Sequence, residues 1–285
     1  MRLAPAAHWL VLALLAAAPA AGQTPGTDGA VFRPLLADPK EPQFFAAYLW
    51  ERSPRLAPRL GSVGFGQTIG VVSARTWQVA IAAAVFSQFN LARPTADLMN
   101  TDYRVGLPVT YRHAGLTTRV QLYHQSSHLG DEYMVHAHAQ RVDLTFEAAE
   151  LLVSQQLAAW RVYGGGEYVF TRSPADLKPG VLHGGVEYRQ PGVPVHLGRL
   201  ATGRVVAALD AKSFQDRSWD VGWSAITGLE LGDPVARADG GGGGGGGGGS
   251  WRWSLLLRAY TGPAPYGEFF RDRVASLGVG LGLAL

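Results

Sequence analysis

A histidine and a serine lie two positions apart in the chain, at His124 and Ser126. If this segment is a β-strand, both side chains project from one face and their Cα atoms are roughly 6.5–7 Å apart. A neutral imidazole at that separation can act as the general base that activates a serine hydroxyl. The pair therefore predicts nucleophilic chemistry, with Ser126 as the nucleophile and His124 as the base. The alternative interpretation is a polar rim without catalytic function.

A second group of residues could bind a cation. Asp131 and Glu132 are adjacent in the sequence, and paired carboxylates supply the oxygen ligands that divalent cations prefer. His136 and His138 are also ligand types, but the sequence nearby offers no third nitrogen or sulfur ligand. A divalent cation at Asp131 and Glu132 is therefore one prediction, and solvated loop side chains are the alternative.

Composition limits the class of protein. The chain has 285 residues, of which 47% are hydrophobic and 16% charged, with a net charge of +3. This hydrophobicity excludes a disordered chain. Cysteine is absent, which excludes disulfide scaffolds and cysteine-ligated zinc sites. The small, dispersed positive charge excludes nucleic acid as the expected partner.

The first residues have the pattern of an export signal. Arg2 and His8 form a short basic start, residues 9–18 are apolar, and Ala18-Pro19-Ala20 offers small residues for cleavage. The apolar run is shorter than the ~20 residues that a spanning helix needs. We therefore expect a signal peptide at residues 1–22, followed by a periplasmic arm at 23–42.

Beyond Pro42 the chain divides into segments with a hydrophobic period of two, which predicts strands. In Trp219–Leu231, for example, the odd positions are largely apolar. We predict about twelve strands, an even number as in bacterial outer-membrane barrels. The segments are Gln43–Leu49, Val63–Val71, Trp77–Gln88, Tyr103–Tyr111, Leu116–Ser126, Gln140–Val153, Trp160–Thr171, Val181–Arg189, Arg204–Ser213, Trp219–Leu231, Trp251–Tyr260 and Val274–Leu285.

Three features favour a membrane barrel over a soluble sandwich. The polar faces are rich in small and charged residues, aromatic residues such as Trp77 and Trp160 lie at segment ends, and short connections alternate with long ones. These are the marks of an antiparallel transmembrane β-barrel with interfacial aromatic girdles. We therefore predict an all-β fold, with the barrel over residues 43–285 in the outer membrane and the glycine run 240–249 in a loop. The barrel-assembly machinery and outer-membrane lipid are the implied partners; the sequence does not determine an oligomeric state.

The alternation places the candidate pair on the lipid-facing side. The even positions from Leu116 to Ser126 are apolar at the start of the segment, so His124 and Ser126 continue the outer face beside the long loop 127–139. Gln140 is the best candidate for orienting the imidazole and Glu132 a poorer one. In the segment from Gln140 the predicted outward set is Gln140, Val142, Leu144 and Phe146, whereas Asp143 and Glu147 are predicted to point inward.

Several sequence blocks resemble the domain-of-unknown-function 1207 family of exported bacterial proteins. The resemblance covers nearly all of the mature chain and implies an outer-membrane setting without an activity. Its blocks are Phe32–Pro42 with Phe44-Phe45-Ala46, Gly106–Arg112, Tyr123–Glu132, Arg161–Tyr168 and Pro265-Tyr266-Gly267. The glycine run and the C-terminal Leu285 depart from the usual pattern.

The His-x-Ser element is also similar to that of outer-membrane phospholipase A and the lipid A 3-O-deacylase. This resemblance implies that His124 is the base and Ser126 the nucleophile of a lipid-ester hydrolase, although Ser127 stands where those enzymes have Asn. The alternative is a non-enzymatic barrel, either a narrow channel or a structural component. The charges predicted to face inward would then line a pore or fill the lumen with salt bridges: Arg104, Arg112, Arg119, Arg141, Asp143, Glu147, Glu167, Glu187 and Arg189.

Overall fold

The computed structural model describes residues 30–139, 141–192, 195–197, 201–232 and 252–284. Four sequence predictions lie outside the described residues: the signal peptide at 1–22, the orienting role of Gln140, the glycine run at 240–249 and the C-terminal Leu285.

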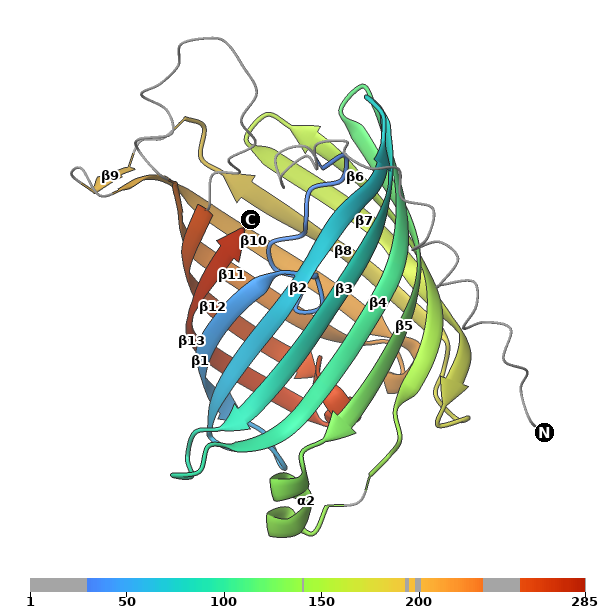
Figure 1. The fold of residues 1–285 in the computed structure, drawn as a ribbon, viewed down its shortest axis with the longest axis vertical. Helices are drawn as coiled ribbons and strands as arrows, with labels where there is room; N and C mark the ends of the chain where they lie inside the picture. Colours follow the sequence, from blue (N-terminus) through green and yellow to red (C-terminus); the bar gives the residue numbers. More distant parts are fainter. Residues whose placement is uncertain (1–29, 140, 193–194, 198–200, 233–251, 285) are drawn as a thin grey trace.

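The chain folds into a closed antiparallel barrel of twelve strands (Figure 1). β1 pairs with both β2 and β13, and β10 pairs with β11, so the sheet has no open edge in the barrel wall. The all-β barrel prediction is therefore confirmed. The strands are β1 (Phe44–Arg52), β2 (Arg59–Ser73), β3 (Trp77–Asn90), β4 (Asp97–His113), β5 (Leu116–Leu129), β6 (Thr145–Leu157), β7 (Trp160–Ser173), β8 (Gly180–Arg189), β10 (Ala201–Phe214), β11 (Asp220–Gly232), β12 (Arg252–Pro263) and β13 (Arg273–Ala284). A short additional strand, β9 (Val195–Leu197), was not predicted from the sequence and pairs with the start of β10 outside the closed wall.

The period of two in the sequence sets which side chains face out. In β4, Val105, Leu107 and Val109 are exposed on the outer face, whereas Arg104 and Thr110 are buried inside. A continuous apolar outer surface of this kind is typical of a barrel in contact with lipid, because exposing it to water is unfavourable. Trp77 and Trp160 open their strands at one end of the barrel and are exposed there.

The two ends of the barrel differ in their connections. At one end β4 and β5 are joined by Ala114 and Gly115, and Gly115 has a φ of +84°, which glycine adopts without strain. The opposite end carries α2 (Asp131–Ala137), η2 (Gln215–Arg217) and η3 (Gly267–Phe269), as Figure 1 shows for α2. Short turns face the periplasm in outer-membrane barrels, so the end with α2 corresponds to the outside. No helix among the described residues has the length and apolar character needed to cross a membrane.

Residues 30–42 lie inside the barrel, where the sequence analysis had expected a periplasmic arm. Phe32 and Leu35 are buried and pack against Leu152 and Tyr163, which point into the lumen from β6 and β7. The expected periplasmic position was therefore wrong for residues 30–42, whereas residues 23–29 lie outside the described part of the chain. Packing inside the barrel removes more of the arm's apolar surface from water than a position outside the barrel would.

The lumen also has an apolar core at the end with α2. Phe45, Phe86 and Met99 point inward from the wall and belong to one buried cluster with Tyr133 and Phe269 of the end segments. This core and residues 30–42, named the luminal arm below, fill much of the interior. The barrel is therefore lined by polar residues in some layers and by apolar residues in others.

Candidate functional site

His124 and Ser126 lie on the outer face of β5, near the end of the barrel that carries α2. Both residues are partly exposed, whereas their neighbours Tyr123, Gln125 and Ser127 are buried inside. Val120 and Leu122, toward the middle of the strand, are about half exposed. The pair therefore lies where the apolar outer belt gives way to polar residues.

A carboxylate on the adjacent strand contacts the histidine. The His124 Nδ1 atom lies 3.0 Å from Oε1 of Glu147, and strand pairing places the two residues directly opposite each other. The alternation in the sequence predicts Glu147 inside the lumen, and that prediction was wrong. Glu147 is therefore the residue that occupies the orienting position beside His124.

The error has a structural cause in β6. Residues 141–144 are not in a strand, and Asp143 has a left-handed φ of 53° with a mostly exposed side chain. Leu144 and Phe146, predicted to face lipid, instead pack inside against Tyr123. Since side chains alternate strictly along a strand, an inward Phe146 requires Glu147 to point outward.

Polar side chains extend the outer row beyond Ser126. His128 is exposed, and its Nδ1 atom lies 2.8 Å from Nη2 of Arg141. Arg141, predicted to point inward, is half-exposed at the end of the barrel and also contacts Glu268 at 3.4 Å. A base, a hydroxyl and a cation therefore follow one another along the rim.

The predicted cation ligands lie close to this row. Asp131 and Glu132 occupy the first turn of α2 and are exposed. Among the described residues, neither carboxylate belongs to a group of three ligand side chains close enough to share one ion. His136 instead contacts Asp97, with 2.8 Å between Nδ1 and Oδ2. A cation at Asp131 and Glu132 therefore stays a prediction.

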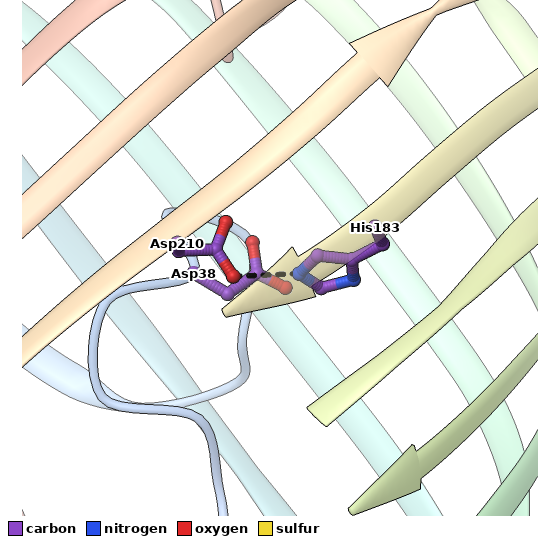
Figure 2. A group of neighbouring side chains, drawn as sticks. All are labelled: Asp38, His183 and Asp210. Atoms are coloured by element: carbon purple, nitrogen blue, oxygen red, sulfur yellow. Dashed lines mark hydrogen bonds and ion pairs between the residues drawn. The ribbon is translucent and has the colours of Figure 1, made fainter. Parts of the chain in front are cut away.

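A second polar cluster lies inside the barrel (Figure 2). Asp38 of the luminal arm meets His183 of β8 and Asp210 of β10, with one ligand atom of each within 4.8 Å of the others. Their donor types suit a divalent cation. However, one Asp210 oxygen already lies 2.6 Å from both His183 Nε2 and the Tyr163 hydroxyl, and Lys212 Nζ lies 3.3 Å from Asp38. The lysine already balances the Asp38 charge and the Asp210 oxygen already has two partners, so we assign the cluster a structural role, although His183 Nδ1 has no hydrogen-bond partner among the described residues.

Salt bridges and hydrogen bonds hold the luminal arm along its length. Glu41 pairs with Arg119, Lys40 with Asp102, and the Leu36 amide donates to Glu187. The prediction of a salt-bridged lumen is therefore correct for these wall residues. It was wrong for Arg141, Asp143 and Glu147, which lie outside the lumen.

The closed antiparallel barrel, its apolar outer belt and its filled lumen define an outer-membrane type of β-barrel protein. Within this class, the chain belongs to the family described as protein of unknown function (DUF1207), whose model matches residues 14–284. No curated protein matches the sequence significantly.

Among solved structures, the barrel is similar to outer membrane phospholipase A from Escherichia coli, with a TM-score of 0.56 and 12% identity over 90% of this chain and 96% of that chain. The Salmonella typhi phospholipase, described as a dimer with bound calcium, gives a TM-score of 0.57 and 12% identity over 92% and 98%. LpxR from Salmonella typhimurium gives a TM-score of 0.39 and 10% identity over 84% and 99%. At such identities the likeness to the phospholipases concerns the fold.

Proposed function

We propose that this protein hydrolyses ester-linked lipid at the outer leaflet, with Ser126 as the nucleophile, His124 as the general base and Glu147 as the orienting carboxylate. The observation that carries the proposal is the 3.0 Å contact between His124 and Glu147 on the lipid-facing wall. A serine two positions along the same face completes the set of groups that acyl transfer needs.

Glu147 gives the histidine a defined protonation pattern. If the carboxylate accepts a hydrogen bond from Nδ1–H, the lone pair of the imidazole is on Nε2. Nε2 can then take the hydroxyl proton as the Ser126 oxygen bonds to the ester carbonyl carbon. The same proton passes to the alcohol as the ester C–O bond breaks, and water repeats the sequence to release the fatty acid. Glu147 stabilises the imidazolium that forms between these steps.

In the structure without substrate, His124 and Ser126 are not yet placed for proton transfer, so we expect the hydrogen bond between them to form when substrate binds. No hydrogen bond joins His124 to Ser126 among the described residues. Their spacing on one strand face is roughly 6.5–7 Å between Cα atoms, so side-chain rotation can bring the two groups together. Catalytic hydrogen bonds are often long before substrate binds.

The position of the three residues supports a lipid substrate. The apolar belt below them would hold acyl chains, and the rim above them carries Arg141 beside His128. A guanidinium at that height suits the phosphate of a lipid headgroup. The reaction also requires no passage through the lumen, which the luminal arm occupies.

The decisive experiment compares Ser126→Ala with Ser127→Ala in the purified, refolded barrel. Ser126→Ala should abolish fatty-acid release from phospholipid in mixed micelles. Ser127 is fully buried on the opposite face of β5, so Ser127→Ala is the matched control and should keep the activity. Heat-dependent migration on a detergent gel verifies folding of both. Activity in Ser126→Ala equal to wild type would exclude the proposed nucleophile.

The same assay tests the predicted cation. Activity with calcium and with a chelator is compared in wild type and in a double variant, Asp131→Asn with Glu132→Gln. If the two carboxylates bind the ion, chelation lowers the wild-type activity and has little further effect on the double variant. A calcium response that survives in the double variant would place the ion elsewhere.

A non-enzymatic structural barrel is the second candidate. The observation that favours it is the attachment of the luminal arm, which buried ion pairs and apolar clusters join to the wall. Absence of lipid hydrolysis by the folded wild-type protein, with and without calcium, would leave this candidate.

A further inference from the structure

A large cavity lies between the luminal arm and the short-turn end of the barrel. Its volume is about 1100 Å³, slightly above the usual range for small-molecule sites. The arm from Ala30 to Leu36 forms its floor, and its walls include the strand ends at Gln67–Gly70 and Gly282–Ala284. Since short turns face the periplasm in barrels of this type, the cavity formed by the described residues lies on that side.

Positive charge dominates the lining of this cavity. Four of its guanidinium groups share only two carboxylates, and a fifth has none. Arg33, Arg161 and Arg189 all lie within 3.7 Å of Glu187. Glu230 pairs with Arg189 and Arg204. Arg112 has no carboxylate partner among the described residues and donates to the backbone of the arm. A sixth arginine, Arg119, is neutralised separately by Glu41 and Glu150.

Burial makes this excess charge costly. The Arg161 side chain is only 4% exposed, and its Nη2 atom has no hydrogen-bond partner among the described residues. Burial, followed by the charge of Arg189, lowers the pKa of Arg33 to about 10. Buried cations without sufficient counter-charge destabilise a fold, so a bound anion would relieve both the repulsion and the unmet hydrogen bond.

We infer that this cavity is a binding site for a small polyanion that enters from the periplasmic side. The guanidinium group is planar and donates paired hydrogen bonds, a geometry that matches carboxylate and phosphate. Several arginines around one cavity would bind a ligand with more than one negative charge. The site is separate from the outer wall that carries His124 and Ser126, and it does not depend on the proposed hydrolysis.

Isothermal titration of the full barrel in detergent at low salt tests the inference, with pyrophosphate and citrate as probes. Binding of either probe supports the site, and the stronger of the two identifies phosphate or carboxylate as the preferred group. Arg161→Gln combined with Arg204→Gln should weaken binding by about tenfold or more. Added sodium chloride should also weaken it, because the attraction is electrostatic.

Two further variants keep the test decisive. Arg204→Gln alone removes a side chain that is 31% exposed, so it should fold even if the double variant does not, and its affinity should still fall. Arg273→Gln removes an exposed arginine at the opposite end of the barrel and should bind like wild type. No binding of either probe to wild type, or equal affinity in Arg204→Gln and wild type, would overturn the inference.

Discussion

Arg119 of β5 binds Glu41 of the luminal arm through two parallel hydrogen bonds, with 2.7 Å between Nη1 and Oε1 and 3.1 Å between Nη2 and Oε2. The Nε atom of the same arginine lies 2.8 Å from Glu150 of β6. All three side chains are less than 10% exposed. One buried guanidinium therefore ties the arm to two adjacent strands.

Removing Glu41, the carboxylate that the arm contributes to this ion pair, should destabilise the barrel. Glu41→Ala leaves Arg119 buried with one of its two carboxylates, a change that typically costs about 3–5 kcal/mol. The measurement is the free energy of unfolding in denaturant, in detergent micelles. Arg55→Ala is the control, because its pair with Asp272 is partly exposed and should contribute about 1 kcal/mol or less. Equal losses in the two variants would contradict a special role for the buried pair.

Apolar packing of the arm can be tested at neighbouring positions of β6. Leu152 is fully buried against Phe32, Leu35 and Tyr163, so Leu152→Ala should cost about 2–5 kcal/mol. Leu151 is half-exposed on the outer face, and Leu151→Ala should cost much less because detergent or lipid refills the space. A larger loss for Leu151→Ala would mean that the two faces of β6 are assigned the wrong way round.

The luminal arm should also control conduction. Deletion of residues 30–42 removes the chain that fills the lumen, together with its bonds to Arg119 and Glu187. In planar bilayers the wild-type barrel should be closed and the deletion variant should show openings. Heat-dependent gel migration checks that the deletion variant still folds. Stable openings of the wild type, at the same conductance as the deletion, would show that the arm does not block the lumen.

Glu147 separates the catalytic interpretation from a polar rim. Glu147→Gln removes the charge that would stabilise the imidazolium, so kcat for lipid hydrolysis should fall by about 10²–10⁴-fold with little change in KM. Asp176→Asn, which neutralises an exposed carboxylate that belongs to neither the catalytic set nor the predicted cation site, is the control and should lower kcat far less. Similar kcat values for Glu147→Gln and wild type would remove Glu147 from the mechanism.

Some features follow from the sequence alone. Strict alternation in Tyr103–Tyr111 determines that Leu107 faces lipid and Arg104 faces the lumen, because a strand side chain has only two directions available. Repetition of that pattern about twelve times predicts the closed antiparallel barrel. The spacing of His124 and Ser126 likewise places both on one face.

Where the alternation of apolar and polar residues was ambiguous, only the tertiary structure decided which side chains face the lumen and which face lipid. In β6, apolar residues lie on both faces, since Leu152 packs against the luminal arm while Leu151 faces lipid. The sequence pattern cannot distinguish these two apolar environments, and it therefore assigned Glu147 to the wrong side. The position of the arm itself depends on partners far away in the chain, such as Arg119 and Glu187. Barrel closure brings these groups together. Burial and charge pairing then determine that the arm lies in the lumen and that Glu147 lies on the outer wall.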